Sequence, residues 1–464
     1  MVLGWGKNRK SIGIAGLIIA SVGGVVAQEA SEPSGVQMTL DLTQRFRAGD
    51  NLEHIATPSG SSAVAQTNLT FGILSETRTQ TLQGTFGGSF ETGYMADDGG
   101  SVARLNDPFA TISYFTESVN SSLTVGASYQ RSDVSDFTFT DSFSPEDFVI
   151  DGGTRDSTNA EIVFETGLGG PVGARIALSY TGRDFQDTID PDLTDREVFT
   201  YDGKLRLALT RSAELQVLTK YREDRDNDAT ETLQTQTEFG FGLNYVMSEA
   251  TDFAVTLTHN QLETLTTTGG VRSSSIEEGL TFGLDVTHDL PNGNLVGSLK
   301  SDVVSSGRKN SYQLTRQFDL PRGAMSLTFG GSQTENGNLN PLYGVSYSQE
   351  FSSSSFSASL TQSSVTEVDG DERLNSRLRA SYSKQITNIS AINLDFSVND
   401  SEITGGTGVD SRRTDVSVTY QRELTRDWNL NTGYRYRLTE RSGSLDRKSN
   451  EIFASATRRF DLRP

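Results

Sequence analysis

Apolar and polar residues alternate along most of the chain, and the alternation is clearest between Ile276 and Ser305. Four apolar residues share one parity there, while the residues between them are polar or small: Leu280, Phe282, Leu284 and Val286. A period of two predicts an extended strand with one apolar and one polar face. The segment Asp289–Asn294 then carries a tight-turn signal, and the alternation resumes after it. Two such strands joined by a turn predict an antiparallel hairpin.

The same unit repeats from about Val36 to the end of the chain, in segments of about ten residues, the length at which a tilted strand crosses a bilayer. Short connections such as Asp319–Gly323 alternate with longer polar ones such as Thr264–Ser275. Short turns at one rim and long loops at the other are typical of outer-membrane barrels. We therefore predict an all-β fold, a single transmembrane antiparallel up-and-down β-barrel of about 22 strands (roughly 18 to 24), with no plug domain.

The N-terminus predicts a secretory signal peptide over residues 1–27. Lys7, Arg9 and Lys10 precede an apolar stretch, Ile12–Val26, and the small residues before Gln28 form a cleavage site. A transmembrane anchor is the alternative, but the apolar stretch is short for one. The predicted organisation is a signal peptide (1–27), a short linker (28–35) and the barrel (36–464).

The composition narrows the functional class. Only 34% of the residues are hydrophobic, which is enough for a barrel that needs an apolar outer face alone. Disorder is the alternative reading of such a composition, and the sustained alternation argues against it. The chain has no cysteine, so it forms no disulfide and no thiolate metal site. The formal net charge of -20 argues against nucleic acid as a partner.

The last predicted strand carries a resemblance to a known class. One face of it holds small and apolar residues that lead to an aromatic residue near the C-terminus: Ile452, Ala454, Ala456 and Phe460. With the alternation, this strand resembles the end of bacterial outer-membrane β-barrels, broadly porin-like, without indicating one family. The resemblance implies recognition by the barrel-assembly machinery, contact with outer-membrane lipid and lipopolysaccharide, and a location in the outer membrane of a Gram-negative bacterium. Two departures are Arg458 on the apolar face and Asp461–Pro464 after Phe460.

Residues with catalytic or metal-binding chemistry are few. His54, His259 and His288 show no spacing typical of a zinc site. Asp224–Asp228 resembles the start of a calcium loop but lacks the glycine and glutamate that such a loop needs at its sixth and twelfth positions. We expect no metal, no cofactor and no enzymatic activity.

Arginines follow the polar faces of the first and last predicted strands. By parity they face the lumen: Arg45, Arg377, Arg379, Arg413, Arg435, Arg437 and Arg459. Carboxylates lie among them: Asp41, Asp395, Asp415 and Glu451. Two interpretations stay open, a charge network that keeps a wide barrel in shape and a ladder that selects solutes.

The longest predicted loop, Asp133–Ser157, is strongly acidic. Its carboxylates face a single basic residue, Arg155: Asp133, Asp136, Asp141, Glu146, Asp147, Asp151 and Asp156. Loops of this length in compact domains are functional or disordered. We expect this one to constrict or cap the lumen.

These observations predict a passive, porin-like channel for small hydrophilic solutes, including anionic or sugar-like ones guided by the arginines. One alternative is a structural or surface-interaction barrel whose acidic loops bind divalent ions, lipopolysaccharide or a partner; another is an outer-membrane hydrolase. About 22 strands enclose a wide lumen, and barrels of that size are usually plugged. Three alternatives follow: the strand count is too high, the loops fold inward, or a partner fills the lumen. The sequence indicates neither the solute nor the oligomeric state.

We expect the mature protein to begin near Gln28 and to fractionate with the outer membrane as a heat-modifiable barrel, because open strand edges are not tolerated in lipid. Cell fractionation with N-terminal sequencing checks this. A soluble periplasmic protein would contradict the prediction.

Overall fold

The computed structural model describes residues 35–97, 99–134, 153–188, 193–229, 231–335, 337, 339–366, 371–405 and 409–462. The predicted signal peptide and all of the predicted linker except Gly35 lie outside these ranges and stay predictions. Within them, no helix is long and apolar enough to cross a bilayer.

The described ranges form 22 strands. Their bounds are β1 (Gly35–Asp50), β2 (Ser61–Glu76), β3 (Gln80–Met95), β4 (Gly100–Glu117), β5 (Ser121–Asp133), β6 (Thr154–Thr166), β7 (Val172–Gln186), β8 (Arg196–Ala208), β9 (Ala213–Asp226), β10 (Thr232–Ser248), β11 (Thr251–Thr268), β12 (Val271–Leu290), β13 (Gly293–Val304), β14 (Gly307–Leu320), β15 (Gly323–Thr334), β16 (Asn340–Glu350), β17 (Ser354–Thr366), β18 (Glu372–Thr387), β19 (Ser390–Gly405), β20 (Ser411–Thr425), β21 (Trp428–Arg441) and β22 (Arg447–Leu462).

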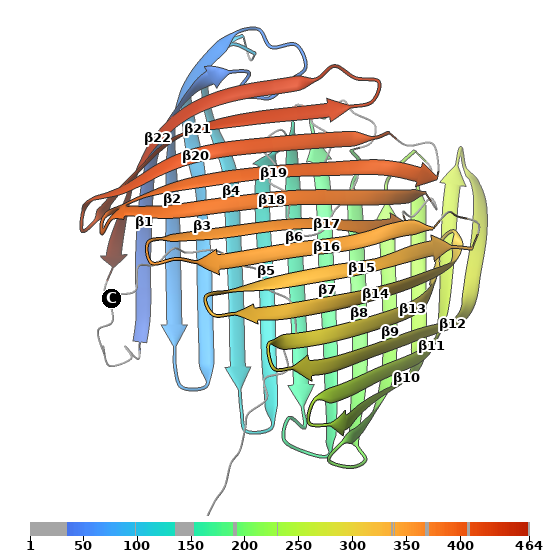
Figure 1. The fold of residues 1–464 in the computed structure, drawn as a ribbon. Coiled ribbons are helices and arrows are strands. Elements are labelled where there is room, and N and C mark those ends of the chain that lie inside the picture. Colours follow the sequence, from blue (N-terminus) through green and yellow to red (C-terminus); the bar gives the residue numbers. More distant parts are fainter. Residues whose placement is uncertain are drawn as a thin grey trace, which may run out of the picture. The chain divides into compact units, whose positions relative to one another are not determined.

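The strands close into one antiparallel up-and-down barrel. Each strand pairs with the next, and β1 pairs with β22 from Met38↔Leu462 to Asp50↔Asn450. In Figure 1 the strands of the near wall, β14 to β22, cross the direction of the far wall, β1 to β9, because all strands are tilted in the barrel. Closure leaves no strand edge along the sheet and so satisfies the backbone in lipid.

The side chains of each strand alternate between an apolar outer face and a polar inner face. Large apolar residues such as Phe241, Phe282 and Leu314 are exposed on the outside, which suits contact with lipid tails. Buried hydrophobic residues are few in the described part of the chain, whereas buried polar and charged residues are numerous. The interior is therefore a polar lumen and not an ordinary hydrophobic core.

Aromatic residues mark the rim with the short turns. The rings of Tyr347 and Phe356, which flank the β16–β17 turn, have centroids 6.2 Å apart. Arg458, the arginine on the apolar face of the last strand, also lies at this rim. Its guanidinium is 5.6 Å from the centre of the Trp428 ring and 4.6 Å from that of Phe460. An arginine on the outer face is tolerated at this level, where the aromatic girdle meets the polar membrane interface.

The predicted loop Thr264–Ser275 is a hairpin end in the structure. β11 and β12 continue to pair up to Thr268↔Val271, and only Gly269 and Gly270 form the turn. Both glycines have positive φ, 57° and 80°, as a tight two-residue hairpin turn requires. The threonines beside them have a high propensity for strands, although the polar composition of the segment had indicated a loop.

We expect Leu314→Arg, in the middle of β14, to lower the free energy of unfolding in lipid vesicles by about 2–4 kcal/mol, since the charge would enter the hydrocarbon. Gln313→Arg is the matched control on the lumenal face, with an expected change within about 0.5 kcal/mol. Urea unfolding measures both. Equal losses would mean that the two faces of β14 are assigned incorrectly.

Candidate functional site in the barrel lumen

The chain turns into the lumen directly after β1. Asn51, Leu52 and His54 are 1%, 1% and 0% exposed, although they belong to a connecting loop. Asn51 and His54 have φ values of 53° and 56°, in the left-handed region where side chains are strained but Asn and His are enriched. We call the segment Asn51–Ile55 the strap.

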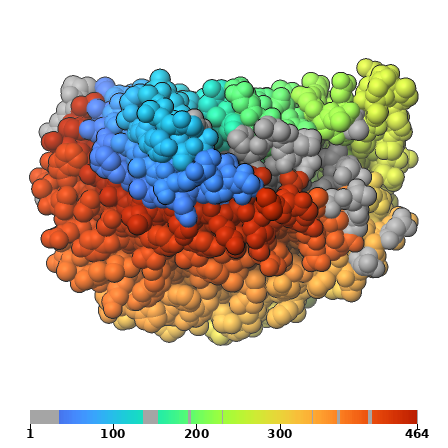
Figure 2. Space-filling model, turned by 90° about the horizontal axis from the view of Figure 1, so that it is seen from above, coloured from blue at the N-terminus to red at the C-terminus, as the bar shows by residue number. Residues whose placement is uncertain are grey.

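The strap is bonded to the last strands of the barrel. The Asn51 amide donates to the carbonyl of Ile55 (2.7 Å) and to that of Lys448 on β22 (2.8 Å), and it accepts from the Ile55 N–H (2.8 Å). Arg437 Nη2 on β21 donates to the Leu52 carbonyl at 2.9 Å. The strap therefore crosses the lumenal side of the β1–β22 seam. In Figure 2 the blue ends of the first hairpins extend over the red surface of the last strands.

Two further contacts anchor the strap. His54 Nε2 lies 3.1 Å from Thr439 Oγ1 on β21. The Leu52 side chain packs with Val64 and Met95, one of the small apolar clusters in the described interior. Because β1–β2 is a long connection and β2–β3 a short one, the strap lies at the long-loop end of the barrel.

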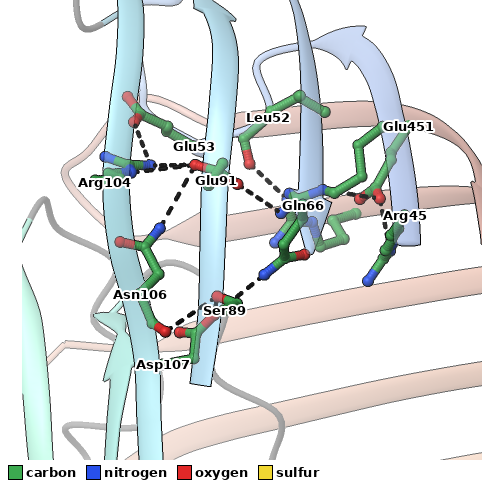
Figure 3. Close-up of polar contacts among 12 residues, drawn as sticks. Arg45, Leu52, Glu53, Gln66, Ser89, Glu91, Arg104, Asn106, Asp107 and Glu451 are labelled. Atoms are coloured by element: carbon green, nitrogen blue, oxygen red, sulfur yellow. Dashed lines mark hydrogen bonds and ion pairs between the residues drawn. The ribbon is translucent and has the colours of Figure 1, made fainter. Parts of the chain in front are cut away.

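A chain of ion pairs lies beside the strap (Figure 3). It contains three arginines and three glutamates: Arg45, Arg47, Arg104, Glu53, Glu91 and Glu451. Glu451 accepts from Arg45 at 2.7 Å and from Arg47 at 3.1 Å. Glu91 pairs with Arg47 at 3.9 Å and with Arg104 at 3.0 Å. This network joins β22, β1, β3 and β4 and is neutral as a whole, so it stabilises the closed seam without presenting a net charge.

The lumenal face of β18 to β21 is cationic instead. Arg413, 1% exposed, donates from Nε to Asp415 at 3.1 Å, and Arg435 approaches the same carboxylate at 3.6 Å. Arg377 Nε donates to Asn399 Oδ1 at 2.9 Å. These side chains are held in fixed positions by neighbouring strands.

A cavity of about 860 Å³ lies on the short-turn side of the strap. Its wall includes four arginines, three aspartates and serines from β15 to β20; the charged residues are Arg45, Arg379, Arg413, Arg435, Asp319, Asp395 and Asp415. Pockets that hold small ligands have volumes of about 300–1,000 Å³, so the cavity is large enough for one.

The structure separates the predicted lumen arginines into three groups. Arg45, Arg379, Arg413 and Arg435 line the cavity. Arg377 and Arg437 are buried beside the strap end of the lumen wall. Arg459 lies nearer the short-turn rim, where it pairs with Asp41 at 3.0 Å and its side chain stays 64% exposed.

Other predicted residues lie elsewhere. Two acidic residues of the predicted cap loop belong to strands: Asp133 is the last residue of β5, and Asp156 on β6 accepts a hydrogen bond from Arg131 at 2.6 Å. The other five lie outside the described residues: Asp136, Asp141, Glu146, Asp147 and Asp151. Ile452, Ala454, Ala456 and Phe460 belong to β22, which pairs with β1; their role in assembly stays a prediction.

The calcium-loop candidate has a different role. Asp224 accepts from Arg196 through both carboxylate oxygens, each at 2.8 Å. Across the described ranges, no group of three His, Asp or Glu side chains is arranged to hold a metal ion.

The strap was not predicted from the sequence, nor were Arg47, Glu91 and Arg104 as members of a network. A weak signal exists in Asn51–His54, where an apolar leucine lies within a polar loop between two residues that tolerate positive φ. Nothing in the local pattern indicates that this loop turns inward.

No protein-family model matches the chain, and no curated protein sequence matches it. Solved structures do match. The FrpB iron transporter from Neisseria meningitidis (F3-3 variant) is 10% identical with a TM-score of 0.59, over 91% of this chain and 81% of that one. The ferric-catecholate import receptor Fiu from E. coli K12 is 10% identical with a TM-score of 0.59, over 94% and 82%. A ferric enterobactin receptor mutant from Pseudomonas aeruginosa, in complex with enterobactin, is 10% identical with a TM-score of 0.54, over 92% and 82%.

These likenesses show the fold, and the resemblance to bacterial outer-membrane β-barrels is confirmed. Two predictions are wrong. The fold class should not exclude a plug domain, because outer-membrane transporters with 22 strands have a plugged lumen. The passive, porin-like channel is also wrong, because the solved barrels of this shape are iron transporters and siderophore receptors. The alternation of apolar and polar residues determines which face of a strand meets lipid, but it carries no information on what fills the space inside the barrel.

We expect Asn51→Ala to release the strap, because it removes three hydrogen bonds worth roughly 1 kcal/mol each and places alanine at a positive φ. Proteinase K should then cut within residues 51–60 faster than in the wild type, as mass spectrometry of the fragments would reveal. Thr57→Ala, in the exposed part of the same loop, is the control. Unchanged cleavage in Asn51→Ala would show that the strap does not depend on this side chain.

Proposed function

We propose that the protein is an outer-membrane transport barrel whose lumen is closed at rest and opens when the strap moves. The observation that carries the proposal is the burial of Asn51, Leu52 and His54 against β21 and β22 at the long-loop end. In outer-membrane barrels the longer loops face outward, so the strap closes the external side.

The binding energy of a solute or partner is large enough to break the contacts that hold the strap. Hydrogen bonds contribute about 1 kcal/mol each to stability. A shift of about 5.5 kcal/mol takes a two-state equilibrium from almost fully closed to almost fully open. A solute or partner that favours the open arrangement by a few kcal/mol is therefore sufficient to displace the strap.

The outer surface of the barrel indicates which partners it would contact in the membrane. The apolar face of the barrel would contact outer-membrane lipid, with lipopolysaccharide around the long-loop side, and β22 would be recognised by the barrel-assembly machinery. Small solutes would pass through the lumen after strap movement. The role would be transport and not catalysis. The solved barrels of the same fold, described as iron transporters and siderophore receptors, support a transport role of the receptor type.

Planar bilayer recordings test the closed lumen. We expect low conductance from the wild type and a several-fold rise when residues 51–56 are replaced by a Gly/Ser segment of equal length. The same replacement of residues 57–60, the exposed part of the loop, is the control and should leave conductance low. A wild type that conducts as well as the strap variant would overturn the proposal.

A further inference from the structure

We infer that the lumenal cavity is a binding site for an anionic solute, one that carries a carboxylate or phosphate group together with hydroxyls. The inference rests on the proposed function, because the cavity lies on the route that strap movement would open. It concerns the part of the lumen below the strap, where residues of β18 to β21 form most of the charged wall.

Charge at the cavity favours an anion. The chain has a formal net charge of -20, yet the cavity wall carries four arginines and three aspartates, an excess of one positive charge. Two more arginines, Arg377 and Arg437, lie on the same lumenal face, in register with the wall residues Asn399 and Asp415. An acidic protein that concentrates cations at one internal wall favours an anion there.

The arginines are also buried. Arg413 and Arg437 are 1% and 0% exposed, and a guanidinium in such surroundings loses most of its hydration. Asp415 pairs with both Arg413 and Arg435. An anionic group that enters the cavity would meet arginines already oriented by neighbouring strands, with little further ordering required. Arginine is suited to this role because its planar fork binds carboxylate and phosphate oxygens in pairs.

The remaining wall of the cavity favours a hydroxylated ligand. It carries small hydroxyl side chains, which both donate and accept hydrogen bonds and leave room for a ligand: Ser346, Ser348, Ser357, Ser359, Ser381, Ser397 and Ser417. Ser417 donates to Asp395 at 3.4 Å, so this carboxylate is positioned beside the arginines to accept from ligand hydroxyls. Such a surface matches a hydroxylated ligand better than an apolar one.

One side of the cavity is a preformed planar surface. Phe453 lines the cavity, and the guanidinium of Arg45 lies 4.9 Å from the centre of its ring. A Cβ on Gly433 would come within 2.8 Å of Phe453 Cζ, so the glycine lets the ring lie close against β21. The stacked arginine thus presents a fixed cationic plane to the cavity.

Isothermal titration of the purified full-length protein in nanodiscs, at low ionic strength, tests the inference with three probes. Glucuronate carries a carboxylate, glucose 6-phosphate carries a phosphate, and glucose is the neutral control. We expect at least one anionic probe to bind and glucose not to bind, with affinity that falls as salt is added. The stronger anion identifies which anionic group the site takes.

Arg379→Gln and Arg435→Gln should each weaken binding of that anion about tenfold (~1.4 kcal/mol). Arg459→Gln is the matched control, a lumenal arginine outside the cavity wall, and should change affinity less than twofold. Heat modifiability verifies that each variant is folded. Binding of glucose equal to that of the anions, no binding of either anion, or undiminished binding by both cavity variants would overturn the inference. None of these results bears on the conductance test of the strap. Low conductance of the strap variant would contradict the proposed function, independently of whether the probes bind.

Discussion

Pairing between β1 and β22 is the interaction on which the rest of the structure depends. In hydrocarbon, an unpaired N–H or C=O group has no water to bond, so a sheet is stable there only when its first and last strands meet. Residues more than 400 positions apart, such as Met38 and Leu462, are thereby brought into register. Closure also assigns every side chain to lipid or lumen, because a slip of one residue would exchange the two faces.

The same closure explains where the charged residues gather. Arg45 and Arg47 leave β1 on its lumenal side and meet Glu451 on β22, so the seam carries ion pairs as well as backbone hydrogen bonds. The strap adds bonds from Asn51 and Leu52 to the last two strands. The interior thus divides into a neutral, densely bonded part at the seam and a cationic part along β18 to β21. The first holds the barrel closed, and the second borders the space in which a solute would lie.

A barrel of 22 strands encloses more space than side chains from the wall alone can fill. In the described part of this chain, the strap and its charged neighbours occupy the long-loop end, and a cavity remains below them. Iron transporters and siderophore receptors share the barrel shape at about a tenth sequence identity. At such low identity, this chain shares the barrel shape with those proteins, whereas the side chains that line its lumen are largely different from theirs. The transport role proposed here therefore depends on the strap and the arginine wall.

The local alternation of apolar and polar residues determined the strands, the direction in which their faces point and the class of the fold. The alternation at Leu280–Val286 specifies a strand without reference to any other segment, and the parity of Arg377 and Arg379 directs both away from the apolar face, since an arginine in mid-membrane is costly. Tertiary structure decided what lies inside. In the sequence, the segment with Asn51, Leu52 and His54 has the pattern of an ordinary polar loop. Its bonds to β21 and β22 exist only because closure of the whole sheet brings those strands beside it. Glu91 and Glu451 likewise share one arginine, Arg47, although 360 positions separate the two glutamates. Such contacts follow from strand register and barrel closure and leave no periodic trace in the sequence.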